Sequence, residues 1–245
     1  MKILKKLSCL FVLGFMLLQN SAFATKNLNI AFVGLYASGK TALRAAATNT
    51  YFDYEDRSAT EAANVFCSNL RYFDKDINCH LYDTSGRDKV RNAIVVHRLK
   101  DADIAVLTID ASENAMLGFN TVFKQNFVKW IGVINEVHPN LPVLLAITKI
   151  DDAIDVDKLC DKVKSFEKAY VDTCDFEGVA TSAKKRINIG STIDSNDLGE
   201  NFWGRIRFII KQRNLYDSLN EDKEIKVFDK DIDNPARNDS KCSIL

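Results

Sequence analysis

Glycine and proline are scarce in this chain of 245 residues, which has 10 glycines and 3 prolines. Together with 47% hydrophobic and 27% charged residues, this scarcity excludes collagen-like, mucin-like and wholly disordered chains. A basic excess is also lacking, because 33 Lys and Arg residues balance 33 Asp and Glu residues. General nucleic-acid binding is therefore not expected. The length favours one globular domain.

The six cysteines show no CxxC pair and no spacing typical of a metal site. Isolated buried thiols are the simplest interpretation, and the sequence assigns no disulfide. The three histidines, His80, His97 and His138, form no nucleophilic or metal-binding arrangement and are interpreted as ordinary strand and helix residues.

The first 24 residues have the pattern of a secretory signal peptide. Three lysines precede an apolar stretch over 9–18, and Ala22 and Ala24 fit the small residues before a cleavage site. A membrane span needs roughly 20 apolar residues, about twice this stretch, so an uncleaved anchor is the weaker interpretation. We expect cleavage before Thr25.

The chain ends in Cys-Ser-Ile-Leu, which fits the pattern for prenylation of Cys242. Residues 214–245 are mostly polar and have no amphipathic period, which predicts a flexible tail. A lipid on Cys242 would bring the protein to a membrane reversibly, because no polybasic patch adjoins it. The alternative is a tail without function, since four-residue patterns also arise by chance.

These two ends imply different compartments, because a signal peptide directs export whereas prenyl transfer occurs in eukaryotic cytosol. Either one signal is not used, or the protein crosses from one cell into another. The second case predicts delivery by a microbe into a host cell.

Between these ends, strand-like and helix-like patterns alternate. The order βαββαβαβαβα favours an α/β fold with an open, mostly parallel sheet, helices on both sides and ligands at the carboxyl ends of the strands. The predicted strands with assigned bounds cover 28–33, 65–72, 77–83, 103–110 and 143–148, and the predicted helices cover 119–137, 156–170 and 202–210.

A phosphate-binding motif follows the first predicted strand. The segment GLYASGKT, residues 34–41, satisfies G-x-x-x-x-G-K-[ST] between a strand and a helix. In such a loop, backbone N–H groups bind phosphate oxygens, Lys40 neutralises the β- and γ-phosphates, and the Thr41 hydroxyl binds Mg²⁺. The predicted nucleotide-binding residues are Gly34, Tyr36, Ala37, Ser38, Gly39, Lys40, Thr41 and Ala42.

Two later strand ends carry acidic residues. Asp83 lies in LYDTSG, where its carboxylate can reach Mg²⁺ and the N–H of Gly86 can approach a γ-phosphate. Asp151 lies in TKID, after the strand predicted at 143–148. An ionised carboxylate accepts hydrogen bonds only, which matches two N–H groups at the edge of guanine and disfavours adenine. TKID at this position therefore favours guanine.

The ordered set GLYASGKT, Thr60, DTSG, TKID and TSAK resembles the Ras-like small GTPases over residues 28–213. The overall pattern is similar to the Rab and Ras proteins, and the phosphate loop is similar to that of the Arf branch. The resemblance implies a P-loop NTPase fold, with a six-stranded, mainly parallel sheet flanked by five helices. Together with the patterns at the two ends, it divides the chain into a predicted signal peptide over 1–24, a GTPase domain over 25–213 and a flexible tail over 214–245.

The resemblance also implies roles for single residues. Thr60 would be the switch threonine that contacts Mg²⁺ and the γ-phosphate. Phe52 would pack against the guanine edge, with Tyr51 as its competitor. Thr148 replaces the commoner Asn, as in the Rho branch, Lys149 would lie along the base, and the Ala183 N–H would meet the exocyclic oxygen. The implied residues are Phe52, Thr148, Lys149, Asp151, Ser182, Ala183 and Lys184 for the nucleotide, Thr41, Thr60 and Asp83 for the metal, and Lys40, Thr60, Gly86 and Arg87 for catalysis.

Two departures from the family pattern predict slow hydrolysis. Arg87 stands where most members have the Gln that positions the attacking water, and a guanidinium cannot accept a hydrogen bond from that water. Tyr36 replaces a glycine near where an activating protein would insert its arginine. Nucleotide binding should survive, because the Arf branch also lacks glycine at that position.

The leading interpretation is a GTP- and Mg²⁺-binding molecular switch with slow hydrolysis, acting in signalling or membrane trafficking. Its surface over 52–66 and 84–98 would bind effector and regulatory proteins when the γ-phosphate is present. One alternative is a pseudo-GTPase that binds nucleotide without turnover. Another is a different P-loop ATPase or kinase, which would prefer ATP and give Asp151 no role.

Overall fold

A computed structural model of the chain describes residues 26–54, 64–84, 88–112, 124–153, 161, 176–194 and 196–219. The predicted signal peptide, the prenylation motif and all but one residue of the helix predicted over 156–170 lie outside these ranges. Within them, no helix is both long and apolar enough to cross a bilayer.

Six strands form one sheet at the centre of the domain. They are β1 (Lys26–Gly34), β2 (Asn64–Tyr72), β3 (Lys75–Asp83), β4 (Ile104–Asp110), β5 (Val143–Thr148) and β6 (Phe176–Ala180). Their spatial order is β2-β3-β1-β4-β5-β6, and each neighbouring pair is parallel except the β2–β3 hairpin. The predicted fold class, a mainly parallel six-stranded α/β sheet, is confirmed.

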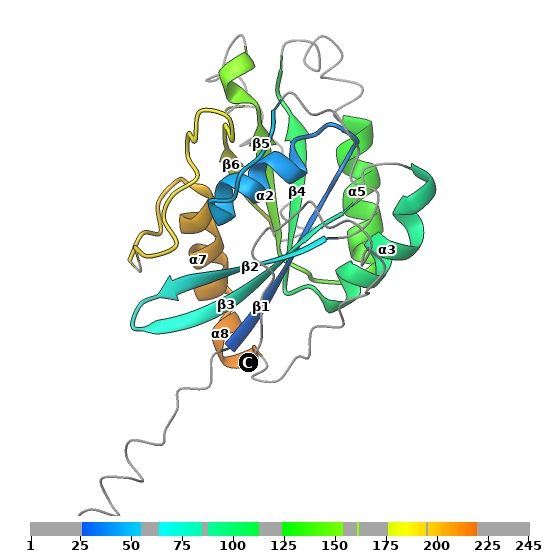
Figure 1. Cartoon of the computed structure of the whole chain (residues 1–245). Coiled ribbons are helices and arrows are strands. Elements are labelled where there is room, and N and C mark those ends of the chain that lie inside the picture. The colour runs from blue at the N-terminus through cyan, green and yellow to red at the C-terminus, as the bar shows by residue number, and fades with distance from the viewer. Residues whose placement is uncertain are drawn as a thin grey trace, which may run out of the picture.

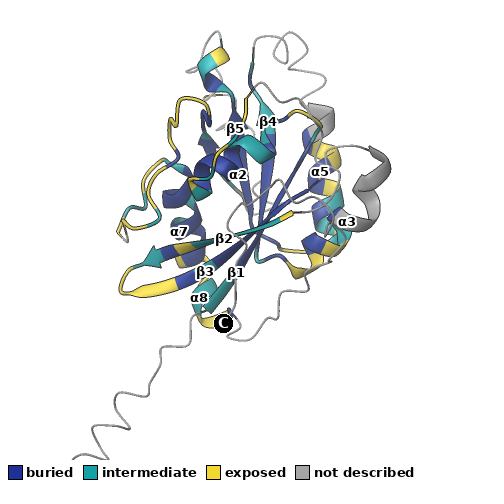
Figure 2. Ribbon diagram, viewed as in Figure 1, coloured by how far each residue is buried: buried dark blue, intermediate teal, exposed yellow. Residues whose placement is uncertain are grey.

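Helices cover both faces of this sheet (Figure 1). The α-helices in the described ranges are α2 (Lys40–Thr48), α3 (Asp88–Asp101), α5 (Lys124–Val137), α7 (Phe202–Gln212) and α8 (Leu215–Ser218). Helices α2 and α7 pack on the face that includes Phe32, and α3 and α5 pack on the face that includes Val33. Because both faces are covered, β5 is buried along its whole length (Figure 2).

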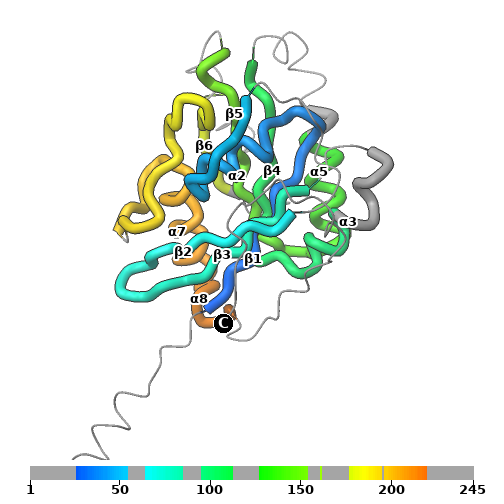
Figure 3. Tube along the Cα trace, viewed as in Figure 1, coloured from blue at the N-terminus to red at the C-terminus, as the bar shows by residue number. Residues whose placement is uncertain are grey.

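The packed domain extends past the expected boundary at Arg213. Tyr216 in α8 stacks on Tyr72 with 6.0 Å between ring centroids. The ammonium groups of Lys26 and Lys75 lie 4.7 and 4.1 Å from the centre of the Tyr216 ring. These contacts place α8 beside the start of β1 (Figure 3). A helix of four residues is too short to give the periodic pattern from which helices are predicted.

Cys67, on β2, is disulfide-bonded. Its partner lies outside the described residues, because Cys79 is the other cysteine within them and is free. The interpretation of the cysteines as isolated thiols is therefore wrong for Cys67. It holds for Cys79, whose complete burial raises the pKa of the thiol. A disulfide between distant segments leaves no local spacing by which the sequence could reveal it.

Candidate functional site

The loop between β1 and α2 lies close to the neighbouring strands. Gly34 and Gly39 have positive φ angles of 144° and 85°. A Cβ atom on Gly34 would lie 2.6 Å from the backbone oxygen of Thr108, and one on Gly39 would lie 3.0 Å from the Thr148 hydroxyl oxygen. Both glycines of the motif are therefore required by the backbone conformation and by close approach to β4 and β5.

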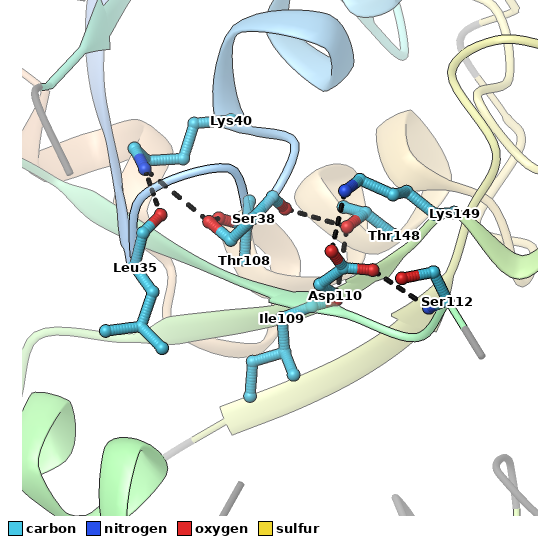
Figure 4. Close-up of polar contacts among 9 residues, drawn as sticks. All are labelled: Leu35, Ser38, Lys40, Thr108, Ile109, Asp110, Ser112, Thr148 and Lys149. Atoms are coloured by element: carbon cyan, nitrogen blue, oxygen red, sulfur yellow. Dashed lines mark hydrogen bonds and ion pairs between the residues drawn. The ribbon is translucent and has the colours of Figure 1, made fainter. Parts of the chain in front are cut away.

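Two buried threonine hydroxyls hold this loop against the sheet (Figure 4). The Thr108 Oγ1 atom lies 2.7 Å from the Ser38 Oγ atom. The Thr148 Oγ1 atom lies 2.7 Å from the Ser38 carbonyl oxygen and 3.1 Å from the Ile109 carbonyl oxygen, and donates toward both. Thr148 therefore connects the phosphate loop to the TKID turn. This contact gives a structural reason for the residue that replaces the commoner Asn.

The first turn of α2 is open to an anion. Its N-cap, Gly39, offers no side-chain cap, and the turn contains no acidic residue. The free N–H groups at a helix N-terminus carry partial positive charge and bind phosphate. The start of α2 is thus suited to the role that the loop motif predicts.

Lys40 places a buried ammonium group inside this loop. Its Nζ donates to the carbonyl oxygens of Leu35 at 2.7 Å and Gly34 at 3.3 Å. Burial lowers the pKa of Lys40 to about 8, and the negative charge of Asp83 partly opposes this shift. The loop therefore holds a cation whose partners are neutral carbonyl and hydroxyl oxygens, which leaves its charge available to a phosphate.

Asp83 is the buried acid at the end of β3. Neither of its carboxylate oxygens has a hydrogen-bond partner among the described residues, and the Nε atom of Arg44 lies 4.0 Å from Oδ2. Burial raises the pKa of Asp83, while the Thr41 hydroxyl, Arg44 and Lys40 oppose that shift. Open carboxylate oxygens beside a hydroxyl are a donor set that fits Mg²⁺.

The TKID turn lies next to the loop, at the ends of β4 and β5. Lys149 adopts a left-handed conformation with φ of 60°, and its Nζ pairs with the Asp110 Oδ2 atom at 2.6 Å. The short 3-10 helix η2 (Ile150–Asp152) then carries Asp151. The backbone N–H of Ile150 donates to the Thr181 carbonyl at 3.3 Å, which brings TKID and TSAK together.

The TSAK loop is ordered by its own contacts. The buried Ser182 hydroxyl accepts a hydrogen bond from the backbone N–H of Lys185 at 3.0 Å. Ser182 also pairs with Ile187 in an isolated antiparallel bridge. The Ala183 backbone is therefore presented on a constrained turn beside TKID, while Lys184 is exposed.

Aromatic residues follow α2 on the same side of the domain. Phe52 is half-buried and packs edge-on against Tyr54 with 4.9 Å between centroids, whereas Tyr51 is 85% exposed. Burial raises the pKa of Tyr54; the positive charge of Arg186 opposes this shift, and the negative charge of Asp151 adds to it. Tyr54 is therefore within electrostatic reach of Asp151. Tyr54 lies outside every sequence motif and therefore was not among the predicted site residues.

Comparison with protein families matches residues 29–151, half of the chain, to the family described as "Ras of Complex, Roc, domain of DAPkinase". The chain belongs to this family. Roc domains are Ras-like P-loop GTPases, so the chain is a GTP-binding switch domain. The match runs from β1 to the TKID turn. A search of curated proteins finds no match.

The Roc domain gathers the described motif residues at the carboxyl edge of its sheet. The loop and the start of α2 contain Gly34, Tyr36, Ala37, Ser38, Gly39, Lys40, Thr41 and Ala42. The carboxyl ends of β3, β5 and β6 and the turns after them contain Asp83, Thr148, Lys149, Asp151, Ser182, Ala183 and Lys184. Thr60, Gly86 and Arg87 lie outside the described residues, as do parts of the ranges 52–66 and 84–98. The roles of all these residues in binding and catalysis stay predictions.

Three polar residues that support this site were not among the predicted site residues. Thr108 and Asp110 lie on β4, beside Ser38 and Lys149, and Arg44 lies on α2, beside Asp83. Neither β4 residue belongs to a motif, and their importance depends on β4 lying between β1 and β5. Asp110 could have been predicted from one sequence feature, because it ends an apolar strand, as Asp83 does.

Proposed function

We propose that this Roc domain binds GDP and GTP with Mg²⁺ and acts as a switch that hydrolyses GTP slowly. The observation that carries the proposal is the 2.7 Å hydrogen bond from Thr148 to the Ser38 carbonyl. This bond fixes the phosphate loop against the turn that carries Asp151. A fixed separation between a phosphate site and a base site suits one nucleotide that spans both.

Each part of the nucleotide has a proposed partner. The N–H groups of the loop and the Lys40 ammonium bind the β- and γ-phosphates. Asp151 accepts the N–H groups of guanine, Lys149 lies along the base, and the Ala183 N–H meets the exocyclic oxygen. Thr41 and Asp83, with Thr60, would hold Mg²⁺, which neutralises negative charge on the phosphates when bound.

Slow hydrolysis is proposed from Arg87 and Tyr36. A permanently charged, donor-only guanidinium cannot accept a hydrogen bond from the attacking water, which is the task of the usual Gln. Tyr36 is 52% exposed in the phosphate loop, where its ring would obstruct an activating protein's arginine. We expect that Arg87→Gln raises the single-turnover rate of GTP cleavage. A wild-type rate typical of well-activated relatives would contradict this proposal, and an absence of turnover in both proteins would favour the pseudo-GTPase alternative.

Calorimetry with the purified chain tests nucleotide choice. We expect GDP and a non-hydrolysable GTP analogue to bind in the presence of Mg²⁺, and ATP to compete poorly. Asp151→Ala should reduce the preference for guanine about a hundredfold, since it removes two hydrogen bonds to a charged acceptor. Asp152→Ala is the matched control, because Asp152 is the exposed neighbour in the same short helix. Absence of heat with every guanine nucleotide would reject the proposal, and ATP preference would favour another P-loop enzyme.

We also propose export by the N-terminal signal peptide and, in a host cell, prenylation of Cys242 and membrane association. The disulfide of Cys67 supports export, because such bonds form and persist in oxidising compartments. A signalling or trafficking role at a cytosolic membrane face would follow. N-terminal sequencing and intact mass of the natively produced protein test both modifications. An uncut N-terminus would reject export by signal cleavage, and an unmodified Cys242 in host cells would reject prenylation.

A further inference from the structure

Asp110 belongs to none of the sequence motifs, yet it contacts the residue proposed to lie along the base. Its Oδ2 atom is 2.6 Å from the Lys149 Nζ atom, and this is the shortest ion pair in the described part of the chain. The side chains are partly buried, with exposed fractions of 22% for Asp110 and 37% for Lys149. The pair is therefore better shielded from water than the surface pair between Arg71 and Asp76.

The Asp110 carboxylate is itself held in place. Its Oδ1 atom accepts a hydrogen bond from the Ser112 backbone N–H at 2.8 Å, while Oδ2 binds Lys149 (Figure 4). The main chain of Asp110 is fixed by the β4–β5 ladder, where Asp110 pairs with Thr148. Because one oxygen of the Asp110 carboxylate is bound to its own loop, the carboxylate is a rigid partner for Lys149. The flexible Lys149 side chain therefore loses little further conformational entropy when a ligand binds.

Asp151 offers Lys149 a competing negative charge. Only one residue separates the two, and the turn between them is tight. In the described residues, Asp151 takes part in no ion pair, whereas Lys149 is directed to Asp110. If the Lys149 ammonium group paired with Asp151, it would occupy the carboxylate oxygens that must accept hydrogen bonds from guanine. The direction of Lys149 therefore determines whether the Asp151 carboxylate is available.

We infer that Asp110 is a positioning residue for guanine selectivity: it holds Lys149 in the base-binding position and away from the Asp151 carboxylate. This inference rests on the proposed function of the TKID turn. It adds to that function a residue from β4 that acts without touching the nucleotide itself.

The test compares GDP and IDP binding in the wild type and in Asp110→Asn. IDP lacks the exocyclic amino group of guanine, so the ratio of the two affinities reports how well Asp151 accepts hydrogen bonds. Asp110→Asn keeps an oxygen for Ser112 but loses the ion pair, so we expect GDP affinity to fall about fivefold and the GDP/IDP preference to fall with it. Asp76→Asn, which breaks the exposed pair with Arg71, is the matched control and should change neither value.

A double-mutant cycle with Lys149→Met distinguishes positioning from general stability. If Asp110 acts through Lys149, Asp110→Asn has no further effect on GDP or IDP affinity in the Lys149→Met background. The inference is overturned if Asp110→Asn leaves the GDP/IDP preference unchanged, or if it lowers the affinities equally in the wild-type and Lys149→Met backgrounds. Either result leaves the proposed guanine binding intact. A wild-type protein that binds no GDP overturns the proposed function and this inference with it.

Discussion

His80 and Asp83 are buried polar residues on the same strand, β3, with opposite surroundings. The His80 Nδ1 atom lies 3.1 Å from the Asn29 Oδ1 atom, and its Nε2 atom lies 3.0 Å from the Asn78 Nδ2 atom. These partners assign the proton of a neutral ring to Nδ1. Both ring nitrogens are therefore satisfied, whereas both oxygens of Asp83 have no hydrogen-bond partner among the described residues.

This difference in hydrogen bonding distinguishes polar groups that stabilise the fold from polar groups that can bind a ligand. Around His80, neutral side chains satisfy one another, and the Tyr82 hydroxyl adds a third hydrogen bond to the network by donating to Asn29 at 3.2 Å. At the phosphate loop, burial disfavours the charged forms of Lys40 and Asp83, which lowers the pKa of Lys40 and raises the pKa of Asp83. Buried groups of this kind, whose charged forms lack a counter-ion in contact, reduce the stability of the unliganded fold and are suited to bind a ligand. Substitutions in the two regions should therefore affect stability and binding in opposite directions.

The largest effect is expected for Lys40→Met. GDP affinity should fall about a thousandfold, because the loop loses its charge-assisted contact to the phosphates. The unliganded protein should become more stable by about 1 kcal/mol, since an apolar side chain of similar length replaces a poorly solvated charge. Calorimetry and urea unfolding at pH 7 measure the two quantities.

The pH dependence provides a second readout for Lys40. The folded protein loses this proton near pH 8, whereas the unfolded chain keeps it to about the ordinary value of 10.5. The free energy of unfolding of the unliganded wild type should therefore rise between these pH values, and this rise should be absent in Lys40→Met. Lys211→Met, on an exposed position of α7, is the control. A variant that loses both stability and affinity would show that Lys40 is a structural residue.

Asn29→Ala should have the reverse profile. The substitution removes the acceptor of His80 and Tyr82 and the donor to the Asp101 carbonyl, so the protein should lose about 3 kcal/mol of unfolding free energy. GDP affinity of the folded protein should stay unchanged. Urea unfolding and calorimetry check both values, with Asn69→Ala, an exposed residue on the edge strand β2, as the control. A loss of GDP affinity comparable to that of Lys40→Met would contradict the separation of the two regions.

The two regions also differ in how much of them the sequence predicts. The phosphate loop and TKID are contiguous segments, so motif and strand pattern together place Lys40 and Asp151 at the correct edge of the sheet. The Asn29 and His80 network depends on the register between β1 and β3, in which these residues are directly paired. Asp110 and Thr108 likewise acquire their roles only when β4 lies between β1 and β5. Local patterns contain no record of such neighbours, which is why these residues were missed.

The smallest effect is expected from protonation of His80. Burial lowers the pKa of His80, so as the pH falls below the ordinary value of 6.5 the unfolded chain takes up a proton that the folded state resists. Protonation would also turn Nε2 into a donor facing the Asn78 amide. At pH 5.5 the wild type should therefore lose about 1 kcal/mol of unfolding free energy that His80→Gln does not lose. Urea unfolding of both proteins from pH 7.5 to 5.5 measures this difference. Burial raises the pKa of Asp83, which gives the unfolding free energy the opposite pH dependence, but this contribution is present in both proteins and cancels in the comparison. His97→Gln, at a half-exposed position on α3, should follow the wild type; if it follows His80→Gln instead, the buried network is not the source of the pH dependence.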